Sequence, residues 1–367
     1  MKFTFPNGSN PEKIVLIVGA GVAGLSAART LLKHNVKVII VEKSNELGGK
    51  IRNIKEIFTL NKSGAELLES IKSEILSHSN VKLLLNSKIY SLKYINEEDF
   101  EVEVHSYLGD ENEKYTSRCF RVNAVILAMG LTSIDAQLIP EMGYKHLQDV
   151  VVSLEFEELF KQQNLKRLSD GGDVNSLAFV QCVGSRVESR GVPYCSSVCC
   201  MNTIKNALAI KKARPQITVY VFYIDIRTHG KCHEELYKEA REAGVLFIRG
   251  LPSLVLPNPG KSGALVCGEN TLLGELYEIP VDLVVLSVGL RQHEESMRLF
   301  KMLNLPLDKC GFPLEKGGES ECTMIDGIFM AGCVEAPKDV RDSILQGKAA
   351  ATAALSYFKT RTIGSTI

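Results

Sequence analysis

The stretch KIVLIVGAGVAGLSAARTLLKHNVKVIIVEK, residues 13–43, decides the fold of the N-terminal part of the chain. It contains an apolar, β-branched strand, the pattern G-x-G-x-x-G at Gly19, Gly21 and Gly24, a helix, and a second apolar strand that ends at Glu42. The first glycine permits a tight turn, the second lets the backbone approach a pyrophosphate, and the third lets helix and sheet pack closely. The stretch therefore predicts a complete βαβ unit that binds a dinucleotide.

The residues after this unit indicate which dinucleotide it binds. A carboxylate at Glu42 accepts hydrogen bonds from both ribose hydroxyls and repels a 2'-phosphate, which favours FAD or NAD over NADP. The sequence ELGGK, residues 46–50, then resembles the second glycine pair with which FAD-dependent proteins of two dinucleotide folds approach the flavin diphosphate. We therefore expect FAD. The alternative is that these glycines only form a surface turn.

The order of the remaining elements predicts an inserted second domain. The runs AVILAMG (124–130) and LVVLSVG (283–289) are apolar strands closed by glycine, and they bracket a strand–helix–strand–helix–strand series that begins at residue 176. This series predicts a second parallel sheet. We expect an α/β fold with two Rossmann-like domains, the second inserted in the first. The expected ranges are 1–150 with 291–367 for the FAD-binding domain and 151–290 for the second domain.

Four cysteines with the spacing C-x12-C-x3-C-C extend from an apolar strand expected at 176–183, the first of the second domain, to a helix expected from about residue 197. They are Cys182, Cys195, Cys199 and Cys200. Iron–sulfur cubanes are held by four cysteine sulfurs, whereas structural zinc sites usually use C-x2-C pairs, and the chain contains no C-x2-C. The spacing favours a [4Fe-4S] cluster. The alternatives are a zinc site, or buried thiols that act as small apolar side chains.

The second domain lacks the glycines that a nicotinamide dinucleotide needs. Where the first fold has GAGVAG, the second has VGSRVESRGVPYCSSVCC. The place between a strand end and a helix start provides backbone amides and the positive end of the helix, and both stabilise the negative charge of a thiolate-ligated cluster. The sequence predicts that a cluster occupies the place of the second dinucleotide.

The C-terminal sequence DGIFMAGCVEAPKDVRDSILQGKAAATAAL predicts a strand, a turn and an alanine-rich helix that return to the first domain. The acidic residue usual after the turn glycine, Gly332, is replaced by Cys333, which either contacts the flavin chain through its backbone or packs. Lys338 either lies near the flavin ring or in a solvated turn. The residues expected to bind the cofactor are Gly19, Gly21, Ala23, Gly24, Glu42, Lys43, Gly49, Lys50, Gly130, Gly332, Cys333 and Lys338.

Composition and the N-terminal sequence narrow the class of protein. Among 367 residues, 43 Lys+Arg balance 43 Asp+Glu, so no global field attracts nucleic acid. The start, MKFTFPNGSNPEK, lacks the apolar segment of an export signal, and no apolar run approaches the about 18 residues that span a bilayer. We expect a cytoplasmic protein without membrane insertion, in which the ten cysteines are reduced thiols or ligands.

The long motifs QCVGSR with PYCSSVCCMNTIK, FYIDIRTHGKCHEELYKEA and AGCVEAPKDVRDS closely resemble the A subunits of heterodisulfide reductases and their relatives, over nearly the whole chain. The resemblance implies FAD in the first domain and a [4Fe-4S] cluster on Cys182, Cys195, Cys199 and Cys200. It also implies electron transfer between them, within a complex that makes or breaks thiol, disulfide or sulfane-sulfur bonds through other subunits. Such proteins are often dimers, so we expect those subunits and a second copy as partners.

Departures from the family pattern suggest a short form. The A subunits of methanogens look longer, with an N-terminal cluster domain and ferredoxin-type C-x2-C-x2-C-x3-C insertions that do not occur here. The short form resembles the corresponding subunit of the heterodisulfide reductase-like system of sulfur oxidisers, and also the A subunit of the quinone-interacting membrane-bound oxidoreductase of sulfate reducers. We favour the sulfur-oxidiser type.

The sequence also leaves alternatives for the role of one further residue and for the function of the whole chain. Lys205 lies one helical turn beyond Cys200, where it is a candidate catalytic cation beside the cluster or the flavin, or a surface lysine. The first rival is an NAD(P)H-dependent disulfide reductase that uses the adjacent Cys199 and Cys200 as a dithiol, although a second G-x-G-x-x-G and a C-x2-C are absent. The second rival is a non-catalytic scaffold that binds zinc.

Overall fold

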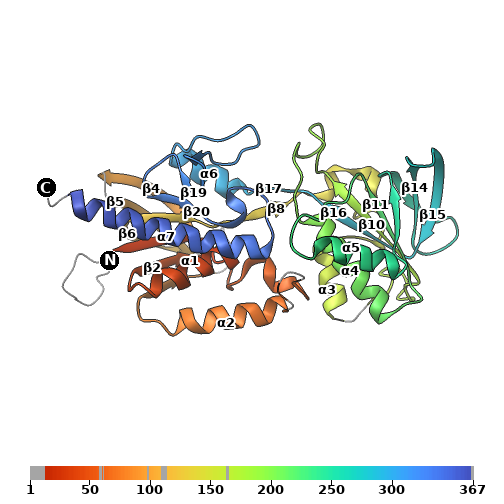
Figure 1. Ribbon diagram of the computed structural model, residues 1–367, viewed down its shortest axis with the longest axis horizontal. Coiled ribbons are helices and arrows are strands. Elements are labelled where there is room, and N and C mark those ends of the chain that lie inside the picture. The colour runs from red at the N-terminus through yellow and green to blue at the C-terminus, as the bar shows by residue number, and fades with distance from the viewer. Residues whose placement is uncertain are drawn as a thin grey trace. The chain divides into compact units, whose positions relative to one another are not determined.

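The computed structural model describes residues 13–57, 60, 62–96, 99–108, 114–162 and 165–364. Tertiary contacts divide the chain into two compact units (Figure 1). Unit 1 comprises residues 1–52, 62–132 and 292–367, and unit 2 comprises 53–61 and 133–291. Unit 2 therefore lies, for the most part, between two segments of unit 1 in the sequence, as in the α/β fold expected from the motifs. The N-terminal segment MKFTFPNGSNPEK, to which the expectation about an export signal refers, lies almost wholly outside the described residues.

Unit 1 is built on a seven-stranded sheet in the order β18-β19-β20-β7-β1-β2-β3. From β20 to β3 neighbouring strands are parallel, and β18 and β19 join as an antiparallel edge. The strands are β1 (Ile14–Val18), β2 (Lys37–Val41), β3 (Val81–Leu84), β7 (Ala124–Leu127), β18 (Glu315–Lys316), β19 (Glu319–Thr323) and β20 (Ile328–Met330).

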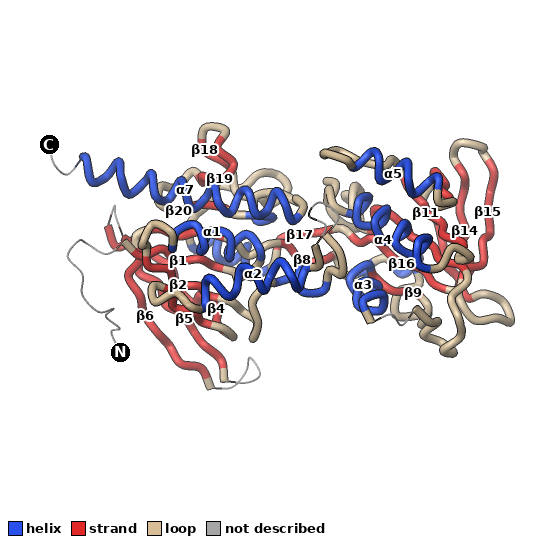
Figure 2. Tube along the Cα trace, turned by 60° about the horizontal axis from the view of Figure 1, so that its bottom comes forward, coloured by secondary structure: helices blue, strands red, loops and turns tan. Residues whose placement is uncertain are grey.

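Different layers cover the two faces of this sheet, because successive side chains of a strand point to opposite sides. Helices α1 (Val22–Leu32), α2 (Gly64–Leu76) and α7 (Val340–Gly364) lie together, with α1 beside both of the others (Figure 2). Apolar residues of the other face pack with the antiparallel strands β4 (Ser87–Asn96), β5 (Asp99–Tyr107) and β6 (Tyr115–Val122), and with α6 (Glu294–Met302).

Unit 2 contains a five-stranded parallel sheet in the order β12-β11-β10-β16-β9. The strands are β9 (Val150–Val152), β10 (Ser176–Val183), β11 (Thr218–Tyr223), β12 (Leu246–Arg249) and β16 (Leu283–Val288). Helix α4 (Cys199–Ala213) connects β10 to β11, and α5 (His233–Glu242) connects β11 to β12. The second parallel sheet predicted from the sequence is confirmed.

The two faces of the unit 2 sheet are also covered differently. Leu177, Phe179 and Val285 face α4, α5 and α3 (Ser153–Lys161), whereas Ala178 and Leu286 face the opposite side. That side packs against a three-stranded antiparallel sheet made of β13 (Pro252–Pro257), β14 (Ala264–Asn270) and β15 (Glu275–Val281). The face to which a side chain of β10 or β16 belongs therefore decides whether it meets α4.

Short elements complete both units. The chain passes between the units at β8 (Leu131–Ser133) and β17 (Leu290–Gln292), which pair with each other. The 3-10 turns among the described residues are η1 (Gly49–Asn53), η2 (Ala136–Leu138), η3 (Pro140–Met142) and η4 (Gly332–Val334). None of the helices in the described part of the chain has both the length and the apolar character needed to cross a bilayer.

Apart from residue 291, which belongs to unit 2, the division into units differs from the expected domain boundaries at two places. Residues 133–150 belong to unit 2, because β9 pairs with β16 and the preceding residues Ala136, Met142 and Tyr144 join the core of that unit. Residues 53–61 also group with unit 2. There the backbone N–H of Lys55 donates to a carboxylate on α3 (3.4 Å).

Candidate functional site

The glycine turn between β1 and α1 combines two close backbone contacts with one open surface. A Cβ on Gly19, whose φ is +103°, would lie 2.4 Å from the Ala128 carbonyl oxygen, and one on Gly24 would lie 2.1 Å from the Gly19 oxygen. A Cβ on Gly21 would meet nothing within 4 Å. Gly130, in the turn after β7, has a φ of +66° and is equally open. Gly19 and Gly24 are thus needed for packing, whereas Gly21 leaves room for a ligand.

The second glycine pair lies directly beside this turn. The Gly48 N–H donates to the Ala20 carbonyl (2.8 Å), and a Cβ on Gly49 would be 3.3 Å from the Gly21 Cα. Lys50 follows in η1. The structure therefore brings together two turns that are far apart in the sequence, and leaves at Gly21 the kind of cradle that a diphosphate needs.

Glu42 ends β2 and is 8% exposed. Its carboxylate accepts hydrogen bonds from the Ala20 N–H (2.7 Å), from the Ser44 N–H (2.9 Å) and from the Ser44 hydroxyl (2.9 Å). These bonds hold the acidic residue against the glycine turn, at the position where a carboxylate binds a ribose.

A pocket continues from Glu42 along unit 1, and it contains residues that the sequence motifs did not reveal. Its polar lining includes Lys43, Lys88, His293 and Glu295. The Glu295 carboxylate accepts from Lys43 Nζ (3.1 Å) and from Lys88 Nζ (2.8 Å). Burial, and then the positive charges of Lys43 and Lys50, lower the pKa of His293 to about 4. No local spacing relates β2, β4 and α6, so only packing reveals this pocket.

The C-terminal turn packs against the first helix. Gly332 has a φ of +71°, and a Cβ on it would lie 2.7 Å from the Cβ of Ala23. A Cβ on Gly347, in α7, would lie 2.3 Å from the Ala23 carbonyl oxygen. Ala23 is thus a contact residue between α1 and the C-terminal segment, and a role for it at the cofactor stays a prediction.

Cys333 and Lys338 interact within the same turn. The Cys333 thiol donates to the Lys338 carbonyl (3.3 Å). Lys338 Nζ donates to the Gly332 carbonyl (3.0 Å), to Glu335 (2.5 Å) and to Gln346 (2.9 Å). The Lys338 side chain is 14% exposed, so it does not lie in a solvated turn. Contact of either residue with a flavin stays a prediction.

The four cysteines of the C-x12-C-x3-C-C motif lie at one end of unit 2. Cys182 is near the carboxyl end of β10, and Cys199 and Cys200 are the first two residues of α4. Cys195 lies in the loop between them, where its sulfur accepts a hydrogen bond from the Ser197 N–H (3.3 Å). Such N–H···S bonds and the positive end of a helix both stabilise thiolate sulfur.

The thiols are close enough to influence one another electrostatically. Burial, and then Cys200, raise the pKa of Cys182 to about 11 against the opposing effect of Arg186. Burial, followed by the charges of Cys182, Cys200 and Cys195, raises the pKa of Cys199. Four ionised thiols at this place therefore need a cationic group among them, and a metal cluster is such a group.

In the described part of the chain, no group of three or more His, Cys, Asp or Glu side chains is arranged to hold a single metal ion. Four thiols with an N–H···S bond, at a helix start, match the donor set of a cluster.

Lys205 does not project from the surface. Its side chain is 6% exposed, and Nζ donates to Glu157 Oε1 at 2.6 Å. The adjacent Asn206 donates to the same oxygen (2.8 Å). The interpretation as a surface lysine is wrong, because the ammonium forms a buried ion pair between α4 and α3. A catalytic role for Lys205 stays a prediction.

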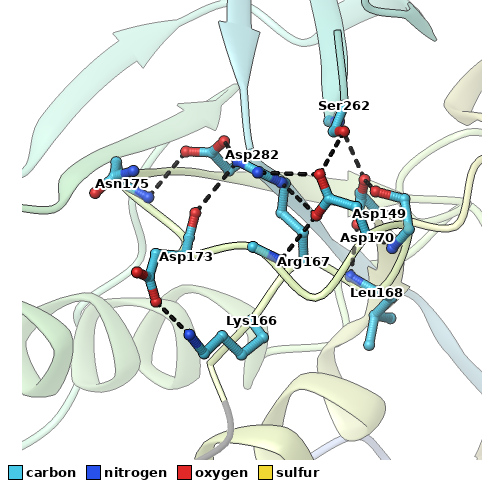
Figure 3. A network of polar contacts seen from close by, with 12 residues as sticks. Asp149, Lys166, Arg167, Leu168, Asp170, Asp173, Asn175, Ser262 and Asp282 are labelled. Atoms are coloured by element: carbon cyan, nitrogen blue, oxygen red, sulfur yellow. Dashed lines mark hydrogen bonds and ion pairs between the residues drawn. The ribbon is translucent and has the colours of Figure 1, made fainter.

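A cluster of carboxylates at the opposite ends of β10 and β16 has a structural role (Figure 3). Asp282 accepts from the N–H groups of Asn175 (2.8 Å) and Ser176 (2.9 Å). Arg167 donates to Asp282 (2.7 Å) and to Asp170 (2.9 Å). These bonds occupy the carboxylates and tie the loop before β10 to the start of β16.

Comparisons with known proteins agree with this architecture. Residues 17–71 match the family described as NAD(P)-binding Rossmann-like domain. Thioredoxin reductases of T. acidophilum (17% identity, TM-score 0.65) and Lactococcus lactis (18%, TM-score 0.64) have the same fold; each match covers 94% of this chain and 99% of the other. At these identities the likeness establishes the fold alone, and it confirms the expected α/β class.

The sequence comparison relates the chain to one group of proteins. The chain is 31% identical to the iron-sulfur A subunit of the CoB–CoM heterodisulfide reductase of Methanocaldococcus jannaschii, over 94% of its own length. The chain is related, over nearly its whole length, to the A subunits of heterodisulfide reductases. A second relative, the A subunit of the H2/formate:CoB-CoM heterodisulfide,ferredoxin reductase of Methanococcus maripaludis, is 30% identical over the same share. This heterodisulfide reductase homologue covers 65% of the length of each of these two relatives, which are named as reductase subunits.

Proposed function

We propose that the chain is an electron-transfer subunit of a heterodisulfide reductase-like complex of sulfur metabolism, with FAD in unit 1 and a [4Fe-4S] cluster in unit 2. The observation that carries the proposal is the convergence of Cys182, Cys195, Cys199 and Cys200 between the end of β10 and the start of α4. Unit 1 uses the equivalent place, between β1 and α1, for its glycine turn.

The two sites have complementary chemistry. A bound flavin exchanges two electrons and a cluster exchanges one at a time, so together they connect two-electron sulfur chemistry to one-electron carriers. In unit 1, the open space at Gly21 and the adjacent Gly49 would hold the diphosphate, and Glu42 would hold the ribose. In unit 2, the four thiols would hold the cluster, with the Ser197 N–H bonded to one sulfur.

The partners belong to the proposal as well. The relatives are named as subunits of CoB–CoM heterodisulfide reductases, so we propose that this chain works with other subunits of such a complex, and as a homodimer. We propose a cytoplasmic sulfur-oxidation complex, with the quinone-interacting complex as the alternative.

Cofactor analysis tests the proposal. Iron, acid-labile sulfide and flavin per chain are measured after anaerobic purification, for the wild type, for Cys199→Ser, and for Cys267→Ser as a control on β14. We expect about four iron and four sulfide with one FAD in the wild type and in the control. In Cys199→Ser the iron is expected to fall while the flavin stays.

Three outcomes would contradict the proposal. Flavin without iron, even after anaerobic reconstitution, would exclude the cluster. Zinc in place of iron would favour a scaffold, and bleaching of the flavin by NADPH alone would favour a self-contained disulfide reductase.

A further inference from the structure

A buried chain of polar side chains lies under the cysteine site. The side chain of Gln181, on β10, is 0% exposed, and its Nε2 donates to Thr203 Oγ1 on α4 at 2.6 Å. Thr203 Oγ1 is 3.1 Å from Ser287 Oγ on β16. Thr203 and Ser287 are 1% and 2% exposed. Gln181, Thr203 and Ser287 are called the buried triad below.

Each member of the buried triad is close in sequence to a cysteine of the site or to a residue that contacts one. Gln181 directly precedes Cys182 on β10. Ser287 directly precedes Val288 on β16, whose carbonyl oxygen is 3.9 Å from the Cys199 sulfur. The third member lies on α4, one helical turn beyond Cys199, so it faces the same side of the helix. The triad therefore links the three elements that surround the cysteines.

The backbone at Cys182 requires such support. The pairing of β10 with β16 shifts register between Val180 and Val183, and Cys182 has a φ of +58°. Such a bulge redirects a side chain, and the left-handed conformation is strained for a residue with a Cβ unless its surroundings hold it. The hydrogen bond of the neighbouring Gln181 to α4 fixes one side of this bulge.

The triad is not explained by stability alone. Gln181 Oε1 is buried and has no hydrogen-bond partner among the described residues. A buried amide that is only half satisfied contributes less to stability than an apolar side chain of similar size, so its presence calls for another reason. The position beside a strained cysteine supplies one.

We propose that the buried triad positions Cys182, and so holds its sulfur in the geometry that the other three cysteines require. Without the hydroxyl at position 203, the amide of Gln181 loses its acceptor and the bulge loses its tie to α4. The inference rests on the proposed function for the identity of the group that the four cysteines hold, which is the cluster. For the geometry of Cys182, it stands on the contacts alone.

The test compares two substitutions of Thr203. Thr203→Val keeps the shape and removes the hydroxyl, whereas Thr203→Ser keeps the hydroxyl. Thr323→Val, at a buried threonine of unit 1, is the matched control. The measurement is the rate at which an iron chelator removes iron from the anaerobic protein. We expect Thr203→Val to lose iron about tenfold faster than the wild type. Thr203→Ser and the control variant are expected to lose iron at the wild-type rate.

The midpoint potential of the cluster separates positioning from general destabilisation. In a titration followed by electron paramagnetic resonance, Thr203→Val is expected to change the ratio of reduced to oxidised cluster at a fixed potential by about threefold or more, and Thr203→Ser is expected to leave it unchanged. Equal rates and equal potentials in Thr203→Val and the wild type would overturn the proposal.

A measurement on iron-free protein distinguishes failure of this inference from failure of the proposed function. If the wild type binds no iron after reconstitution, the cluster is excluded. The alkylation rate of Cys182, followed by peptide mass spectrometry, still reports its positioning. We expect faster alkylation in Thr203→Val than in Thr203→Ser and the wild type, and equal rates would overturn the role of the triad.

Discussion

Lys205 Nζ on α4 and Glu157 Oε1 on α3 are 2.6 Å apart, and both side chains are buried, at 6% and 1% exposed. Removing one partner of a buried ion pair leaves an uncompensated charge, which costs about 3–5 kcal/mol. We therefore expect Lys205→Met to lower the free energy of unfolding by about 3 kcal/mol, measured by urea denaturation.

The double variant Lys205→Met/Glu157→Leu is the control for this prediction. It is expected to recover most of the lost stability, because the second substitution removes the unpaired carboxylate. If Lys205→Met instead kept full stability and only slowed electron transfer, the side chain would have a catalytic role and the ion pair would be unimportant.

Alanine substitutions at two glycines of the first turn are expected to have different effects: one at Gly24 should impair folding, and one at Gly21 should impair flavin binding. A Cβ on Gly24 would overlap the Gly19 oxygen at 2.1 Å, so Gly24→Ala should fold poorly. Gly21 has an open Cβ position and φ −71°, ψ 179°, which alanine adopts without strain. Gly21→Ala should therefore keep the wild-type circular dichroism spectrum and melting temperature in the flavin-free form.

Flavin content is the readout that completes this comparison. Gly21→Ala is expected to lose most of its bound FAD, because the methyl group occupies the place of the diphosphate. Full flavin content in this variant would place the cofactor elsewhere.

Protonation of His293 is expected to weaken unit 1 in mild acid. Burial and the neighbouring Lys43 lower the pKa of His293 to about 4, whereas in the unfolded chain it is about 6.5. Between these values the unfolded state binds more protons than the folded state, so stability falls as the pH falls from about 6.5 towards 4. His293→Gln should flatten this part of the profile.

Melting temperatures from pH 7.5 to 4.5, at matched flavin content, check this prediction. Below pH 6.5, the melting temperature of the wild type should fall more steeply with decreasing pH than that of His293→Gln. Parallel profiles would show that another group determines the acid sensitivity.

Asp282 should stabilise unit 2 at neutral pH. Burial opposes its ionisation, but the hydrogen bonds from Asn175, Arg167 and Ser176 outweigh burial and lower its pKa. The contribution is complete above the unfolded pKa of about 4 and is lost as the pH falls through the lower folded value. Asp282→Asn should cost about 1–3 kcal/mol at pH 7, because charged acceptors form the stronger hydrogen bonds.

Urea denaturation at pH 7 and at about pH 3 tests whether the stabilisation by Asp282 decreases in acid. The difference between Asp282→Asn and the wild type should shrink at the lower pH. A difference that stays constant would mean that the carboxylate remains ionised or acts through its shape alone.

Local patterns predicted much of the fold. The strand SLAFVQCV, expected at 176–183, is β10 with the same bounds. The helix expected from about residue 197 begins at Cys199, because the loop before it is held by its own contacts, such as the Arg186 N–H bond to the Tyr194 carbonyl (3.1 Å). The pairing of β3 with β2 in the parallel sheet joins distant segments, and no local pattern indicates it.

The polar residues were harder to interpret than the glycines and cysteines. Lys205 looked like a surface or catalytic cation because its partner Glu157 lies 48 residues earlier in the sequence. Gln181 was the available signal for the buried triad, since it interrupts an apolar strand. Its partners on α4 and β16 appear only when those elements pack.

The sequence by itself determined the βαβ units, the glycine turn with its acidic residue, and the grouping of four cysteines around one strand end. These features depend on short spacings, because turn, strand and helix geometry act over a few residues. The tertiary structure alone decided that Gly49 lies beside Gly21, that Lys205 pairs with Glu157, and that His293 lines the pocket of Glu42. Such contacts join segments that no local geometry relates, so they exist only once the sheets and helices have packed.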